Sequence, residues 1–136
     1  MFPKTLLDNE LTYKIIGVLY KVHNKLGPYH KEKTYQKALE KEFQNQKISF
    51  KKEIPVKIKY EDNDIGIYYV DFIIADKVIV ETKTLNEVHP KFFNQILSYM
   101  NQLQVPLGLI TNFRAQRLWV KRLILPNKYL GKKTSA

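Results

Sequence analysis

Residues 70–83 read VDFIIADKVIVETK, and this stretch decides the fold. Two apolar runs rich in β-branched residues flank residues 75–77, which is the pattern of two strands joined by a three-residue loop. Antiparallel pairing across that loop places Asp71 opposite Glu81, whereas a slip of one residue would move Asp71 to the other face. The stretch therefore predicts a β-hairpin with one acid on each strand.

The rest of the chain changes its apolar period in a definite order. Helical spacing predicts helices over residues 11–26, 31–46 and 90–103. Alternating or continuous apolar runs predict strands over residues 54–60, 65–74, 78–84, 105–110 and 118–123. A helix crosses between the third and fourth strands, so the order ααβββαββ predicts an α/β (α+β) fold in which helices pack on a mixed sheet.

The length of 136 residues corresponds to about one domain. No Gly- or Ser-rich linker divides the chain, and we expect a single domain over residues 1–126 followed by a flexible basic tail over residues 127–136. The absence of cysteine excludes disulfides, thiolate zinc sites and cysteine nucleophiles. No apolar stretch reaches the ~20 residues of a membrane span, and the start is not a secretion signal, so we expect a cytoplasmic protein.

The chain has 23 Lys and Arg against 13 Asp and Glu, which gives a net charge of +10. This excess favours a polyanionic partner, with nucleic acid the first candidate and an anionic membrane surface the second. A basic surface that is merely solvated agrees equally well with the charge alone. Lys33, Lys37 and Lys41 recur at i,i+4 intervals on the second predicted helix, where they form either a phosphate-facing ridge or a solvated face.

Asp71 and Glu81 lie within apolar runs, where an unpaired charge is costly to bury. Opposed residues have Cβ atoms about 5 Å apart, so the two carboxylates repel unless a cation such as Mg²⁺ or Mn²⁺ lies between them. Lys83 points to the same face as Glu81, and it would hold or deprotonate a water beside the metal or stabilise developing negative charge. This arrangement suits phosphodiester hydrolysis. The alternative is an ordinary Asp71–Lys83 ion pair with Glu81 solvated at an edge.

Asp71 followed by Glu81-Thr82-Lys83 on the next strand resembles the PD-(D/E)XK nuclease signature, whose core order αβββαβ matches the later part of the predicted order. More narrowly, the chain resembles the GxxExxY group of that superfamily over about residues 11–124. The words that match are LTYKIIG at 11–17, VHNKLG at 22–27, EKTY at 32–35, VDF at 70–72, KVIVE at 77–81, QILSY at 95–99 and GLITNF at 108–113. The resemblance implies a restriction-endonuclease-like core.

The resemblance also implies a function and a set of roles. It implies a nuclease that uses Mg²⁺ or Mn²⁺ to hydrolyse nucleic acid, with DNA as the first expectation. Asp71 and Glu81 would bind the metal together with the main-chain carbonyl of Thr82, and Lys83 would be the catalytic lysine. Glu32 matches an additional acid that many members direct at the metal, although a first-turn acid stabilised by the helix dipole explains it nearly as well.

Gln95 and Tyr99 match the Gln-x-x-x-Tyr element of RecB-like nucleases. Their i,i+4 spacing puts both on one side of the helix, where they would meet the site or the nucleic-acid backbone. At the position of the glycine that names the GxxExxY group, this chain has Tyr29. A bulky residue there would affect how the loop positions Glu32.

Three functions are compatible with these features. We rank a nuclease first because both acids and the lysine of the signature are present. A catalytically inactive nucleic-acid-binding module on the same fold comes second, and a protein-interaction domain third. A nuclease of this size that cuts both strands would be expected to pair with itself as a homodimer.

Overall fold

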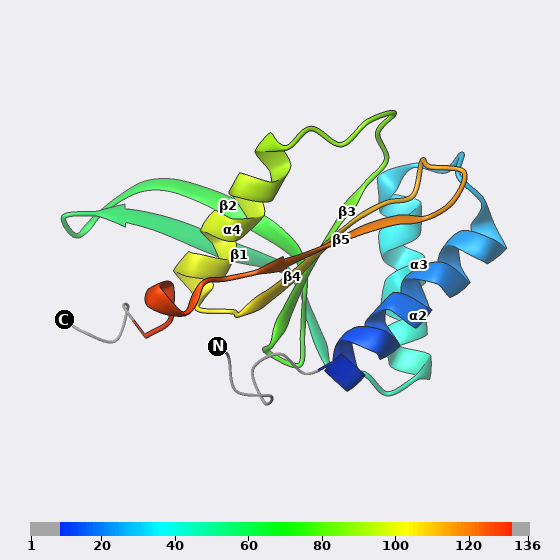
Figure 1. Ribbon diagram of the computed structural model, residues 1–136, viewed down its shortest axis with the longest axis horizontal. Coiled ribbons are helices and arrows are strands. Elements are labelled where there is room, and N and C mark those ends of the chain that lie inside the picture. The colour runs from blue at the N-terminus through cyan, green and yellow to red at the C-terminus, as the bar shows by residue number, and fades with distance from the viewer. Residues whose placement is uncertain (1–8, 132–136) are drawn as a thin grey trace.

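The computed structural model describes residues 9–131, whose helices and strands follow the predicted order ααβββαββ (Figure 1). The prediction of a mixed α/β fold is confirmed. In chain order the elements are α2 (Asn9–Leu26), α3 (Glu32–Asn45), β1 (Phe50–Tyr60), β2 (Asn63–Ile74), β3 (Val78–Lys83), α4 (Lys91–Leu103), β4 (Leu107–Asn112), β5 (Trp119–Ile124) and the short 3-10 helix η1 (Asn127–Tyr129).

The strands form one sheet in the order β1-β2-β3-β4-β5. Strands β3 and β4 run parallel because α4 crosses between them, and the other neighbours are antiparallel. The β2–β3 register is the one that the three-residue loop predicts: Phe72 pairs with Val80, Ile73 with Ile79, and Ile74 with Val78. The ladder ends at Phe72 and Val80, so the two acids follow directly after the last pair.

The sheet separates two cores. Its strand residues pack on one side against α2 and α3, through residues such as Leu19, Phe43 and Phe113, and on the other side against α4. Buried apolar side chains on both faces explain why β3 and β4 read as nearly continuous apolar runs. Figure 1 shows α2 and α3 together at one end of the sheet and α4 crossing the β1–β2 hairpin at the other.

The β1–β2 hairpin is irregular at two places: its register shifts between Ile58 and Lys59, and the alternation of side chains slips near its base. Phe72 packs toward α2 and α3, whereas Val70 packs toward α4, although residues two apart in a strand normally share a face. On β1 the ladder passes from Lys52 to Ile54 and leaves Glu53 and Asp71 without a pair. Glu53 has a φ of 52°, in the left-handed region. The slip therefore falls at Asp71.

The chain beyond β5 folds back onto the α4 side of the sheet. Tyr129 and Leu130 pack against the α4 core, and Gln104 Nε2 donates to the carbonyl of Tyr129 at 3.0 Å. Tyr129 and Leu130 thus bury apolar surface against a segment distant in sequence, within the stretch 127–131 that the sequence predicts as part of a tail. The remainder of that predicted tail, residues 132–136, lies outside the described residues, as do residues 1–8.

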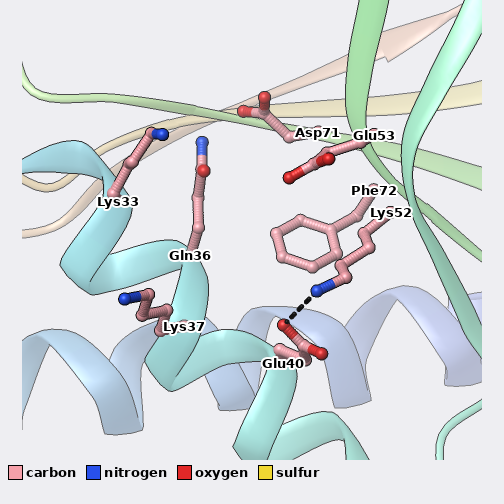
Figure 2. Close-up of a pocket in the computed structure, with 8 residues that line it drawn as sticks. All are labelled: Lys33, Gln36, Lys37, Glu40, Lys52, Glu53, Asp71 and Phe72. Carbon is pink, nitrogen blue, oxygen red and sulfur yellow. Dashed lines mark hydrogen bonds and ion pairs between the residues drawn. The ribbon is translucent and has the colours of Figure 1, made fainter.

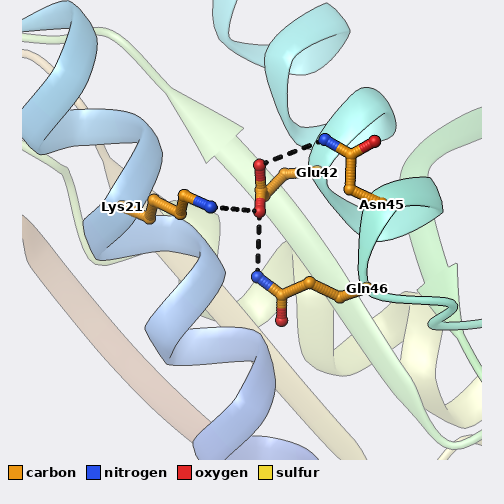
Figure 3. Close-up of polar contacts among 4 residues, drawn as sticks. All are labelled: Lys21, Glu42, Asn45 and Gln46. Carbon is orange, nitrogen blue, oxygen red and sulfur yellow. Dashed lines mark hydrogen bonds and ion pairs between the residues drawn. The ribbon is translucent and has the colours of Figure 1, made fainter.

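A polar network joins α2 to α3 (Figure 3). Lys21 Nζ lies 2.8 Å from Glu42 Oε2, and Gln46 Nε2 donates to the same oxygen at 2.9 Å. Asn45 Nδ2 donates to the other carboxylate oxygen at 3.5 Å. These donors, led by Lys21, stabilise the carboxylate and lower the pKa of Glu42 to about 2. The network holds α3 in place, and α3 carries Glu32 and the predicted lysine ridge.

We expect Glu42→Gln to lower the melting temperature at neutral pH. A carboxyl whose folded pKa is depressed adds stability above its unfolded pKa near 4.5, and that stability is lost as the pH falls toward 2. The difference between variant and wild type should therefore shrink as the pH is lowered through this window, as measured by thermal unfolding. Glu10→Gln is the control, because its exposed 3.8 Å pair with Lys14 contributes little. An equal loss at every pH would contradict the assignment.

Candidate functional site

Polar side chains occupy the point where β2 and β3 separate. The backbone N–H of Asp71 donates to Glu81 Oε1 at 2.9 Å. In the other direction, the backbone N–H and the hydroxyl of Thr82 donate to Asp71 Oδ2 at 2.9 and 2.8 Å. Each acid thus accepts a hydrogen bond from the opposite strand, and these bonds continue the pairing beyond the last ladder pair. The predicted register is confirmed up to the site.

The two carboxylates approach the site from different sides of the sheet. Glu81 follows the alternation of Ile79, lies on the α4 side and is 6% exposed. Asp71 accepts from the hydroxyl of Thr82, to which Gln36 Nε2 on α3 also donates at 3.0 Å. The expectation that Asp71 and Glu81 share one face is wrong, because the alternation of β2 slips at Asp71 and turns its carboxylate toward α3.

The acids nevertheless interact electrostatically. Burial raises the pKa of Glu81 to about 8; Asp71, and more weakly Glu32, also raise it, whereas the Asp71 N–H and Lys83 lower it. The pKa of Glu32 is raised by burial first and by Asp71 second, and Lys83 opposes this. Three acids and one lysine therefore form a single cluster. Glu32, the first residue of α3, interacts with this cluster, and its role as a metal ligand stays a prediction.

The cluster provides the hard oxygen donors that Mg²⁺ and Mn²⁺ prefer. A divalent cation would also offset the mutual repulsion that raises the pKa of its acids. Among residues 9–131, no three His, Asp or Glu side chains are already gathered closely enough to hold a metal ion. The donor chemistry therefore fits a metal, with ligation depending on Asp71, Glu81 and main-chain oxygen rather than on a ready-made cage of side chains.

Lys83 lies on the α4 side with Glu81, as strand alternation predicts. Its Nζ lies 4.4 Å from the ring centroid of Phe92 on α4, a cation–π contact beside the site. The ion pairs of the described residues do not include one between Asp71 and Lys83. The alternative of an Asp71–Lys83 pair with a solvated Glu81 is therefore wrong.

A pocket of about 150 Å³ opens beside Asp71, between α3 and the β1–β2 hairpin (Figure 2). Lys33, Gln36 and Lys37 line it from α3, and Figure 2 shows Gln36 extending toward the strand that carries Asp71. Of the predicted lysine ridge, Lys33 and Lys37 thus reach this pocket, and Lys41 is exposed elsewhere on the helix. The other charged residues of the lining are Glu40, Lys52 and Glu53, and Lys52 pairs with Glu40 at 3.1 Å, so Lys33 and Lys37 are the lysines left to meet an anionic ligand.

The two α4 residues of the Gln-x-x-x-Tyr element lie in different environments. Tyr99 is 5% exposed, and its ring centroid lies 5.6 Å from that of Tyr68 on β2. Burial, with Glu81 as the second cause, raises the pKa of Tyr99 to about 12, so its hydroxyl stays protonated near the cluster. Gln95 is exposed one turn earlier. Tyr99 therefore lies close enough to Glu81 for the carboxylate to affect its pKa, and the role of Gln95 stays a prediction.

Sequence reasoning does not single out Gln36 or Glu53, which both line the pocket. Gln36 follows Glu32 by one helical turn, and this spacing on a helix that begins at the site is a signal that could have found it. Glu53 lies opposite the slip in β2. No local sequence pattern predicts that a strand residue such as Glu53 has no partner in the β1–β2 ladder.

Residues 9–123 match the family model described as the PD-(D/E)XK nuclease superfamily. The matched range runs from the first residue of α2 into β5 and includes the whole acid cluster. No curated protein matches the chain, and no solved structure does. None of the helices within residues 9–131 is long and apolar enough to cross a membrane.

We expect the metal-free protein to lose stability as the pH rises. A buried acid with a raised folded pKa holds its proton in the folded state, so stability falls between the unfolded value near 4.5 and about 8. Urea unfolding in EDTA should show a loss of unfolding free energy on the order of 5 kcal/mol across this window. Glu81→Gln should remove most of the slope, whereas Glu87→Gln, an exposed loop substitution, should leave it unchanged. The same slope in Glu81→Gln and wild type would refute the assignment.

Proposed function

Because the chain belongs to the PD-(D/E)XK nuclease superfamily, we propose that it hydrolyses phosphodiester bonds of DNA with Mg²⁺ or Mn²⁺ as cofactor. The observation that carries the proposal is the set of hydrogen bonds that joins Asp71 to Glu81 and Thr82 at the end of the β2–β3 ladder. It joins two acids of the signature at one point of the fold. The words that the chain shares with the GxxExxY group support the narrower assignment to that group.

Asp71 and Glu81 would hold the metal, with the main-chain carbonyl of Thr82 and the carboxylate of Glu32 as further oxygen donors. Support comes from the raised pKa of Glu81, which burial raises first and the negative charge of Asp71 second, because a bound cation would offset both costs. When bound, the metal supplies Lewis-acid polarisation of the phosphate and a lowered pKa for its bound water. Gln36 would position Thr82 through its 3.0 Å hydrogen bond to the hydroxyl.

Lys83 would stabilise the negative charge that develops on the phosphate or hold the attacking water. Its contact with Phe92 keeps the ammonium near Glu81 and free of a carboxylate partner among the described residues. Lys33 and Lys37 would bind neighbouring phosphates at the pocket beside Asp71. Two copies of the chain would be needed to cut both strands of a duplex at one place.

A catalytically inactive nucleic-acid-binding module is the second candidate. The observation that favours it is the turn of Asp71 toward Thr82, together with the lack of three gathered metal-binding side chains within residues 9–131. Binding would then depend on Lys33 and Lys37 and on the net charge of +10 rather than on the acids. Measurement of cleavage separates the two candidates.

We expect purified protein to cleave plasmid or single-stranded DNA when Mg²⁺ or Mn²⁺ is added. Asp71→Ala and Lys83→Ala should each reduce the rate roughly 100-fold or more, because each removes charge stabilisation at the reacting phosphate. Asp76→Ala and Lys25→Ala are the matched controls, since both residues are exposed and lie outside the acid cluster. Salt-sensitive binding without cleavage would favour the inactive module, and no binding at low salt would leave a protein-interaction domain.

We expect Glu81→Gln to abolish Mn²⁺ binding while preserving the fold, since the amide keeps the shape of the side chain and removes its charge. Calorimetric titration measures the affinity, and circular dichroism checks the fold. For wild type, affinity should rise with pH up to about 8, because the metal must displace the proton that Glu81 holds. Glu87→Gln serves as the control. Unchanged Mn²⁺ affinity in Glu81→Gln would count against Glu81 as a ligand.

A further inference from the structure

The β1–β2 hairpin extends past the rest of the sheet as a two-stranded ribbon (Figure 1). Strand β3 pairs with residues 72–74 of β2, so within residues 9–131 no third strand pairs with residues 54–60 and 63–70. One face of this ribbon packs against α4 through Val56 and Val70. The other face is exposed in the part of the chain that the structure describes, and α3 meets the hairpin near its base, at the pocket beside Asp71.

The open face carries aromatic and apolar side chains beside lysines. The register pairs Pro55 with Tyr69 and Lys57 with Ile67, directed away from the α4 core. Tyr69 is 61% exposed, Ile67 49% and Ile65 65%. We call this surface the ribbon face; it consists of Pro55, Lys57, Lys59, Ile65, Ile67 and Tyr69. Large side chains exposed together on one face mark an interaction surface.

The ribbon face is continuous with the candidate site. Tyr69 precedes Asp71 by two residues on β2, and Lys52 and Glu53, which line the pocket, directly precede the ribbon on β1. Lys33 borders the same pocket from α3. A band of basic and aromatic side chains therefore runs from the acid cluster along the length of the ribbon.

The charges on this face favour an anionic occupant. Lys57 takes part in no ion pair among the described residues, and Lys59 has a 3.9 Å pair with Asp64 in which both side chains are exposed. Asp64 also borders a shallow groove with Lys57 and Ile67, and Glu53 adjoins the face at the pocket, so these two acids stand beside the lysines. A second copy of the chain fits less well, because two such faces would bring their lysines together.

We infer that the ribbon face binds a single strand of the nucleic acid that the proposed nuclease cuts, an inference that rests on the proposed function. The bases lie against Tyr69 and Ile67, and the phosphates lie near Lys57 and Lys59. Unpaired bases offer π-faces to aromatic side chains, whereas a duplex presents mainly phosphates to a flat surface and leaves the apolar side chains without a role. The face then delivers the strand to the pocket beside Asp71.

Binding of fluorescein-labelled oligothymidine to the full chain, measured by anisotropy in EDTA, tests this inference without cleavage. Tyr69→Ala should weaken binding roughly tenfold or more, as loss of one stacked base predicts. Lys57→Ala should reduce the slope of log affinity against log salt by about 0.7, the value for one phosphate contact on a single strand. Tyr13→Ala and Lys14→Ala are the matched controls on α2, where Tyr13 is 81% exposed; both should bind as wild type.

Several results would overturn the inference. These are unchanged binding by Tyr69→Ala, tighter binding of wild type to a duplex of the same length, and a change of oligomeric state in Tyr69→Ala without a change in DNA binding. Cleavage by wild type with unaltered oligothymidine binding by Tyr69→Ala would refute the ribbon face and leave the nuclease proposal intact. Weakened binding by Tyr69→Ala in a protein that never cleaves would support the face and refute the nuclease.

Discussion

The hydrogen bonds that join Asp71 to Glu81 and Thr82 are the constraint on which the rest of the structure depends. A buried carboxyl group is costly unless it accepts hydrogen bonds, and each acid here accepts them from the opposite strand. Side-chain acceptors thereby replace the backbone ladder at the point where β2 leaves β3. Strands β2 and β3 separate at that point while these polar groups keep their hydrogen bonds. The acids remain close enough for Asp71 to raise the pKa of Glu81.

Each helix that borders this opening contributes a different contact. α3 brings Gln36 to the hydroxyl of Thr82, and its own position is held by the bond between Glu42 and Lys21 on α2. α4 contributes Phe92 beneath the ammonium of Lys83 and helps to bury Glu81. Burial is the largest cause of the raised pKa of Glu81, and the charge of Asp71 is the second.

One irregularity links the site to the ribbon. Because the ladder omits Glu53 and Asp71, the side chains on either side of this point exchange faces. The exchange turns the carboxylate of Asp71 toward α3. It also places Val70 beneath α4 and leaves Tyr69 exposed on the opposite face. A strictly regular hairpin would have put both acids on the α4 side and altered which surface of the ribbon meets solvent.

The sequence by itself determined the element order and the hairpin register, because apolar periods and a three-residue loop are local properties. It also identified Glu81 and Lys83 as residues of one face. Only the tertiary structure decided that Asp71 turns toward α3, because the slip involves the pairing of β1 with β2. The pKa of Glu81 and the packing of residues 127–131 likewise depend on α4 and on Gln104, which are distant in sequence. Contacts of that kind leave no local pattern from which to predict them.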